Sequence, residues 1–180
     1  YKRQGIYSPM QLVGVDPGTH GALVLADTRS KKIWIKHMPE DERELEIILN
    51  KLPRSRHRIM YIEKMSYAMS GGGKVSNPRS SGVLGEATGK VLGYAAAAGY
   101  AVTKVSPIVW MRAVGAYDTG LTARDRTKWK NNLKRIAMEN FPGAKVTLQN
   151  ADALLILLYA YRELNDDHTL TLDNWDIERI

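Results

Sequence analysis

Cysteine is absent from this chain of 180 residues, and phenylalanine occurs only once. Without cysteine the protein can form neither disulfides nor thiolate metal sites, an absence that is typical of intracellular proteins. The four histidines are scattered along the chain, so a zinc site made of clustered histidines is not expected either. No apolar run reaches the length of about 18 residues that a membrane-spanning helix needs, so we expect no membrane segment.

The N-terminal residues 1–10 are basic but lack the apolar core of a secretory signal. We interpret them as an N-terminal extension or a remnant of cloning that precedes a native start at Met10. The hydrophobic content of 44% supports one domain, which we place over residues 11–165. The acidic residues 166–180 are expected to form a loosely attached C-terminal tail.

Positive charge dominates the chain, which has 26 Lys and Arg, 19 Asp and Glu and a net charge of +7. Residues 51–90 and 104–135 each hold eight Lys and Arg against two acids, whereas residues 163–180 hold six acids against one Arg. Two basic blocks on one small domain indicate a polyanion partner, most simply nucleic acid. The alternative is a solvated basic surface that binds nothing.

The expected elements are three strands and a helix, followed by strands and helices in alternation. Strands are predicted over 11–16, 21–27, 31–37, 58–64 and 100–106, and helices over 41–52, 82–99, 107–114, 127–140 and 150–164. Short turns join the first three strands, so they should form an antiparallel meander. The fourth strand is reached through a helix and should run parallel to the first. Residues 65–81 form a long loop rich in Gly and Ser, and such loops are usually functional.

A row of glycines marks the helix predicted over 82–99, where Gly85, Gly89 and Gly93 recur every four residues. Each helical glycine costs about 1 kcal/mol relative to alanine. We therefore expect a close approach to this face, either by the sheet of the same molecule or by a partner helix.

Three isolated acids stand at the ends of apolar segments. Asp16 ends the first strand before a Pro-Gly turn, Glu63 ends the fourth strand, and Asp152 lies in the first turn of an apolar helix. Parallel neighbouring strands end at the same sheet edge, so Asp16 and Glu63 should lie close together. Asp16 could instead be an ordinary turn aspartate, and Asp152 an ordinary capping residue.

Carboxylates that cluster repel one another unless a cation neutralises them, and Mg²⁺ or Mn²⁺ suits a site made of oxygens. Two such ions about 4 Å apart are the arrangement that cleaves phosphodiesters.

Several segments carry a resemblance to a known family. They are, in chain order, GVDPGTHGALVL, YIEKM, LGEATGKVLGYAAAAG, VSPIVWMRAVG and NADALLILLYA. In this order and spacing they resemble the RuvC family of Holliday-junction resolvases, particularly its phage-type members, over about residues 11–163. The resemblance implies an α/β fold, namely a ribonuclease H-like mixed sheet with flanking helices. It also implies a homodimer that binds a four-way DNA junction, in the cytoplasm of a bacterium or phage-infected cell or in an organelle.

The same resemblance implies Mg²⁺-dependent endonuclease activity, with two ions per site, Mg²⁺ or Mn²⁺. Two symmetric phosphodiesters would be hydrolysed, leaving 5′-phosphate and 3′-hydroxyl ends. Asp16, Glu63 and Asp152 match the family's metal ligands on the first strand, the fourth strand and the final helix.

Gln149 departs from the family pattern, which usually has an acid or a histidine about one turn before the last aspartate. Positions i and i+3 share a helix face, so Gln149 is expected to point into the site beside Asp152. A neutral amide is a poor metal ligand and cannot act as a base. An alternative function is therefore a junction-binding protein with impaired cleavage, either natural or inactivated by substitution.

Basic residues on the long loop and around the helix at 127–140 are expected to contact DNA phosphates. They are Lys74, Arg79, Arg124, Arg126, Lys128 and Lys130. Tyr67 could stack on a base at the opened crossover or pack back on the domain, with Met65 or Met69 as alternative wedges.

A two-fold dimer would supply two opposed active sites, with contacts from the helix at 82–99 and from the region of Trp110. A more distant alternative is the sugar-kinase and actin-like ATPase class, which also opens with an aspartate and a glycine in a β-hairpin. Such proteins are about twice this length and have a second glycine-rich phosphate loop, which this sequence does not display.

Overall fold

A mixed six-stranded sheet forms the centre of the protein in the computed structural model, which describes residues 9–52, 57–64, 78–117, 120 and 125–180. The strands are β1 (Met10–Asp16), β2 (Ala22–Asp27), β3 (Lys32–His37), β4 (His57–Glu63), β5 (Ala101–Val105) and β6 (Asp176–Arg179). The helices are α1 (Glu42–Asn50), α2 (Pro78–Ala97), α3 (Pro107–Ala113), α4 (Arg126–Asn140) and α5 (Ala151–Asn165). The strand order is β5-β4-β1-β2-β3-β6.

The pairing of the strands confirms the predicted topology. β1, β2 and β3 form an antiparallel meander, and β4 pairs with β1 in parallel. Val15 lies opposite Ile62 in that parallel pair, so Asp16 and Glu63 follow side by side at the same end of the sheet.

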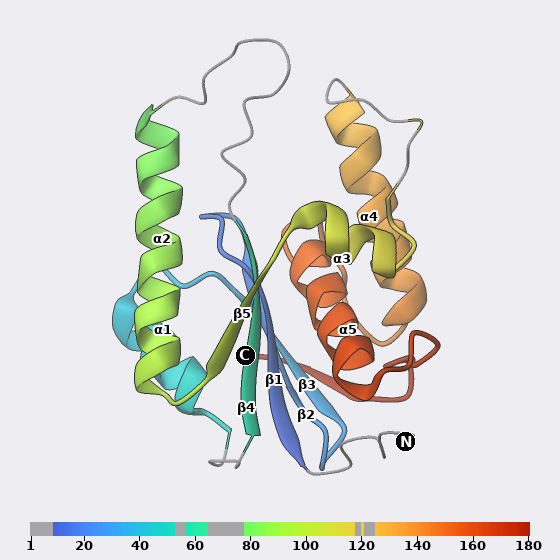
Figure 1. The fold of residues 1–180 in the computed structure, drawn as a ribbon, viewed down its shortest axis with the longest axis horizontal. Coiled ribbons are helices and arrows are strands. Elements are labelled where there is room, and N and C mark those ends of the chain that lie inside the picture. Colours follow the sequence, from blue (N-terminus) through green and yellow to red (C-terminus); the bar gives the residue numbers. More distant parts are fainter. Residues whose placement is uncertain (1–8, 53–56, 65–77, 118–119, 121–124) are drawn as a thin grey trace.

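Helices cover both faces of the sheet, with α1 and α2 on one side and α3, α4 and α5 on the other (Figure 1). Alternate residues of a strand point to opposite faces. Accordingly Leu12 packs into the core under α5, whereas Val13 packs into the core under α1 and α2. Every residue from 151 to 160 is buried, which explains why this helix is apolar on all sides.

Gly14 allows α5 to approach the sheet at backbone distance. A Cβ atom at Gly14 would lie 2.5 Å from the Ala153 carbonyl oxygen and 2.6 Å from the Leu157 nitrogen. Such contacts are too short for any side chain, so only glycine fits here. Because Gly14 is two residues before Asp16 and Ala153 follows Asp152, this contact brings the start of α5 to the carboxyl edge of β1.

Arg58 is a buried arginine whose role the sequence does not reveal. Its Nε donates to Gln11 Oε1 at 2.7 Å, and its terminal nitrogens donate to the carbonyls of Leu49, at 3.0 Å, and Ala98. The guanidinium also lies 4.7 Å from the centre of the Tyr100 ring. A cation near helix C-termini satisfies unpaired carbonyls. Arg58 thus ties the ends of α1 and α2 to the sheet.

The acidic C-terminal segment differs from the loose tail expected from its charge. β6 adds to the sheet edge in parallel with β3, and Leu172 and Trp175 are buried in the core. Glu178 accepts hydrogen bonds from Lys32 Nζ and Trp34 Nε1, both at 2.9 Å. Apolar burial and these partners on β3 outweigh the repulsion among the acids, so the segment belongs to the domain.

Helix α2 begins at Pro78, four residues before the predicted start, and proline is favoured at the first helical position. None of the helices in the described ranges combines the length and apolar character needed to cross a bilayer.

Candidate functional site

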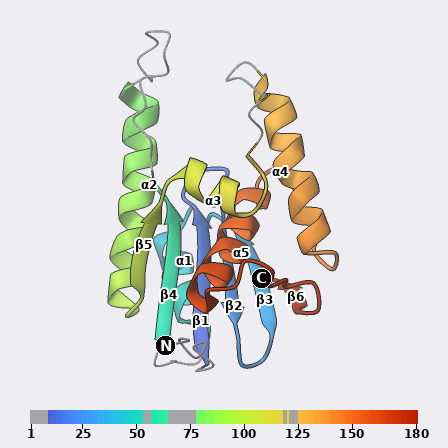
Figure 2. The same cartoon turned by 45° about the vertical axis from the view of Figure 1, so that its right-hand side comes forward.

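The carboxyl ends of β1 and β4 meet at the upper edge of the sheet, between the ends at which α2 and α4 begin (Figures 1 and 2). A cavity of about 450 Å³ opens at this edge. Its lining residues are Asp16, Gly18, Thr19, His20, Gly21, Glu63, Arg126, Lys130, Leu148, Gln149 and Asp152. The structure therefore brings together the four side chains that the sequence singles out as catalytic candidates, which are separated by up to 136 positions of the chain (152 − 16).

Asp16 is held by the turn that follows β1. Its Oδ1 accepts a hydrogen bond of 3.1 Å from the Gly18 nitrogen, and the Gly21 nitrogen donates to the Gly18 carbonyl at 2.8 Å. A Cβ at Gly21 would lie 2.1 Å from the Asp16 carbonyl oxygen, so this turn requires glycine. Asp16 is thus both a turn aspartate and part of the cavity wall.

Glu63 is held by a tryptophan from α3. Trp110 is 1% exposed and its Nε1 donates to Glu63 Oε2 at 3.0 Å. Burial, together with the charges of Asp16 and Asp152, raises the pKa of Glu63 to about 8 against the opposing effects of Trp110 and Lys130. The carboxyl is therefore costly to ionise where it stands, and a cation in the cavity would remove that cost.

The core encloses the Trp110 side chain, so the dimer contact expected from the region around it would come from other residues of α3. The exposed apolar residues of α3 are instead Ile108 and Val109, at 46% and 49%. A tryptophan in an amphipathic segment is compatible with either location, and only the docking of α3 on α5 decides between them.

Asp152 forms an ion pair across the cavity. Lys130 Nζ of α4 lies 2.5 Å from Asp152 Oδ2. The other oxygen, Oδ1, is buried and has no hydrogen-bond partner within the part of the chain that the structure describes. Burial alone would lower the pKa of Lys130, but the carboxylates of Asp152, Asp16 and Glu63 raise it, so Lys130 stays charged.

Gln149 lies in the turn before α5, which begins at Ala151, so it is a turn and not helical spacing that brings Gln149 toward Asp152. The turn is built by Asn150, whose side chain accepts from the Thr147 nitrogen at 2.8 Å and donates to the Lys145 carbonyl at 3.2 Å. Gln149 is exposed and lines the cavity. The turn therefore achieves the proximity to Asp152 that helical spacing predicts.

The fold of this chain is similar to that of proteins whose structures have been solved. Thermus thermophilus RuvC in complex with a Holliday junction substrate is 20% identical, with a TM-score of 0.55, and the alignment covers 86% of this chain and 94% of that one. A second Thermus thermophilus RuvC structure is 20% identical, with a TM-score of 0.54 and coverage of 86% and 95%. The chain has the RuvC fold. No protein-family model matches it, and neither does any curated protein sequence.

The RuvC fold confirms the expected ribonuclease H-like mixed sheet with flanking helices. It also accounts for the meeting of the carboxylates, because β1, β4 and α5 are the elements that converge at the sheet edge.

The oxygen atoms that line the cavity are suitable ligands for a divalent cation. All three acids offer oxygen, the ligand that Mg²⁺ and Mn²⁺ prefer, and Asp152 Oδ1 is a buried acceptor with no donor among the described residues. Within the described ranges, however, no three His, Asp or Glu side chains form a group that could hold an ion as they stand. Lys130 instead supplies positive charge to Asp152.

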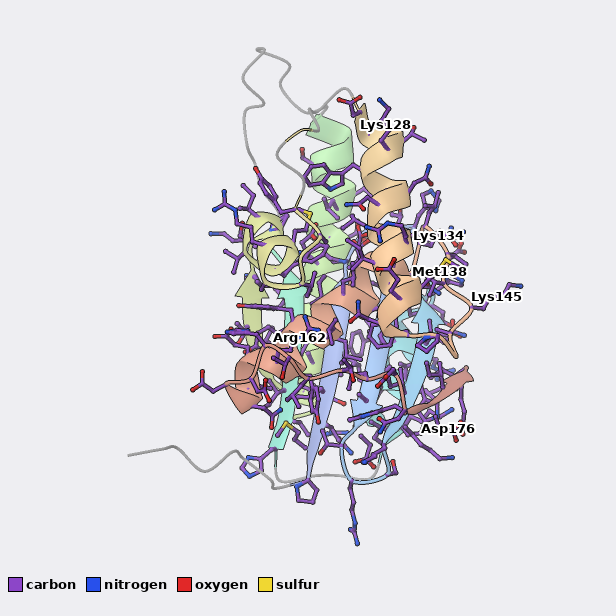
Figure 3. The ribbon with its side chains drawn as sticks, turned by 90° about the vertical axis from the view of Figure 1, so that its right-hand side faces the viewer. Lys128, Lys134, Met138, Lys145, Arg162 and Asp176 are labelled. Atoms are coloured by element: carbon purple, nitrogen blue, oxygen red, sulfur yellow. The ribbon has the colours of Figure 1, made fainter. Side chains whose placement is uncertain are left out.

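The residues expected to bind DNA are only partly within the described chain. Tyr67, Lys74 and Arg124, like Met65 and Met69, lie outside it, and the side chain of Arg79 in the first turn of α2 is also not described. The remaining three are on α4: Arg126 and Lys130 line the cavity, and Lys128 is exposed beside Asp125 at 3.5 Å. Figure 3 labels Lys128 near the start of α4 and Lys134 further along the same helix.

Proposed function

We propose that this chain is a divalent-metal-dependent endonuclease that cleaves four-way DNA junctions, a phage-type resolvase of the RuvC kind. The observation that carries the proposal is a single cavity on a RuvC fold that collects Asp16, Glu63 and Asp152 beside the basic Arg126 and Lys130. Its substrate would be met in the cytoplasm of a bacterium or of a phage-infected cell.

The oxygens of Asp16, Glu63 and Asp152 would hold two Mg²⁺ or Mn²⁺ ions. Bound ions of this kind lower the pKa of water and stabilise the leaving oxygen of a phosphodiester. The turn at Gly18 orients Asp16, and Trp110 orients Glu63. Arg126 would attract the phosphate from the side of α4. Hydrolysis in this site would leave 5′-phosphate and 3′-hydroxyl ends.

A homodimer is part of the proposal, because resolution of a junction needs two opposed cuts. The glycine row of α2 supports it. A Cβ built at Gly85, Gly89 or Gly93 would meet no described atom within 4 Å, so packing on the sheet does not explain the row. A second copy of α2 is the remaining expectation for a face made of such small residues.

Cleavage of a labelled four-way junction in Mg²⁺ and in Mn²⁺ tests this function. We expect paired nicks at symmetric positions in the junction and none in a linear duplex of the same arms. A protein that binds the junction but produces no nicks in either metal would contradict the nuclease and favour a second candidate.

The second candidate is a junction-binding protein with impaired cleavage. Two observations favour it: the neutral Gln149 lines the cavity, and Lys130 already pairs with Asp152. For this candidate, Gln149→Asp should restore or accelerate cleavage and lower the metal concentration required, because it adds a charged ligand. Asn174→Asp, at an exposed turn of the C-terminal segment, is the matched control. Equal cleavage by Gln149→Asp and the wild type at every metal concentration would exclude a role for Gln149.

A further inference from the structure

We infer that Lys130 is a built-in counter-ion that competes with the divalent cation for Asp152 and is released toward DNA phosphate when that cation binds. The inference rests on the proposed function and adds to it a coupling between metal and DNA through one side chain of α4.

The geometry of the pair carries the first step. Lys130 Nζ lies 2.5 Å from Asp152 Oδ2, and the side chains are 33% and 9% exposed. Asp152 is therefore enclosed, while Lys130 reaches it from the solvent side of the cavity. In this state the ammonium neutralises a carboxylate that would otherwise be buried among two further acids.

The helix that carries Lys130 is anchored by Trp129, which precedes that residue, and by Asn132, two positions after it. Trp129 packs edge-on against Tyr117, with ring centres 5.7 Å apart, and Asn132 Nδ2 donates to the Ala116 carbonyl at 3.4 Å. These contacts hold the backbone of α4 against the segment after α3. The four-carbon side chain of Lys130 is then the part that can change position.

A divalent cation and the Lys130 ammonium cannot share Asp152 without strong repulsion, since both charges would lie within a few ångströms in a partly desolvated cavity. Metal on Asp152 thus displaces Lys130 toward the open side, where Arg126 already lines the cavity. A phosphate there would hold the released ammonium. Because coupling between two ligands is reciprocal, metal should strengthen DNA binding and DNA should strengthen metal binding.

The test is a Mn²⁺ titration of the full chain without DNA, measured by calorimetry. It compares the wild type, Lys130→Met and Lys134→Met. We expect Lys130→Met to bind Mn²⁺ about 10-fold more tightly than the wild type, within the usual range of site coupling. Lys134→Met removes the same charge one turn along α4, where no described acid pairs with it, and should behave as the wild type. Equal or weaker Mn²⁺ binding by Lys130→Met would overturn the inference.

A second measurement on the unaltered protein covers the case in which Lys130→Met fails to fold. The extent of lysine acetylation by a soluble amine-reactive reagent can be measured by mass spectrometry. It should rise several-fold at Lys130 on addition of Mn²⁺ and stay constant at Lys134. No rise at Lys130 while Mn²⁺ binds would overturn the inference and leave the nuclease proposal standing. No Mn²⁺ binding by any variant would overturn the nuclease proposal together with the inference.

Discussion

Asp16 both accepts a hydrogen bond within its turn and lines the cavity. A substitution that keeps its size but removes its charge therefore tests the role of the charge alone. Asp16→Asn keeps an oxygen that can accept from Gly18 but removes the negative charge. We expect loss of cleavage by at least about 100-fold, with junction affinity unchanged or higher because repulsion of phosphate is reduced. Gel-based cleavage and binding assays measure the two effects.

Asp27 offers a matched control for Asp16. It accepts from the Arg29 nitrogen at 3.0 Å in the turn after β2, and it lies outside the cavity. Asp27→Asn should cleave as the wild type does. Wild-type cleavage by Asp16→Asn would show that the site is assigned to the wrong acid.

Trp110 is a positioning residue, since it touches Glu63 and not the open cavity. Trp110→Phe keeps an aromatic ring in the core but deletes the Nε1 donor together with part of the indole. Loss of a hydrogen bond that orients a metal ligand typically costs 10–100-fold in metal affinity or activity. We expect weaker Mn²⁺ binding in this range, measured by calorimetry.

Trp34→Phe is the control for Trp110→Phe, because Trp34 donates in the same way to Glu178, at 2.9 Å on β6. It should leave Mn²⁺ binding unaltered. An equal loss in both variants would mean that general loosening of the core, and not the Glu63 contact, is responsible.

At the scale of elements, the contact between β1 and α5 depends on Gly14. Gly14→Ala would force a methyl group into the backbone of α5, and neither element can yield without moving Asp16 or Asp152. We expect a loss of about 3 kcal/mol in the free energy of unfolding, measured in urea. Gly143→Ala, whose added Cβ would meet only Ile177 Cδ1 at 3.8 Å, should change stability little. Equal stability of Gly14→Ala and wild type would contradict this packing.

Substitutions on the glycine face of α2 distinguish a monomer from the proposed dimer. In a monomer, Gly89→Ala should stabilise the helix by up to about 1 kcal/mol, because a Cβ there meets none of the described residues within 4 Å. If this face packs on a second copy, Gly89→Gln should block the close approach and yield a 20.2 kDa species in light scattering. A wild type that is monomeric at micromolar concentration would exclude the dimer, and a dimeric Gly89→Gln would place the interface elsewhere.

For the whole molecule, the net charge of +7 predicts junction binding that weakens steeply with salt. With about six phosphate contacts per chain, affinity should fall roughly 10³-fold between 50 and 200 mM salt. Lys128→Met should make the logarithmic salt slope shallower by about one unit, whereas Lys51→Met, exposed beyond the end of α1, should not. A slope near zero would contradict binding through the basic surface.

The sequence by itself determined the order of the elements as far as α5, the meander of β1 to β3 and the meeting of Asp16 and Glu63 at one edge. These are local properties: alternating or continuous apolar runs, turns rich in glycine and proline, and helix-terminal residues. The parallel pairing of β4 with β1 followed from the helix between them, and so Asp16 and Glu63 could be placed together before any coordinates.

Only the tertiary structure decided which residues hold Glu63 and Asp152. Lys130 is 22 residues from Asp152, and Trp110 is 47 residues from Glu63, so neither pair leaves a periodic signal. Both pairs depend on how α3 and α4 dock beside α5. β6 likewise escaped prediction because its four residues become a strand only by pairing with β3, where burial of neighbouring apolar side chains outweighs the local excess of acids.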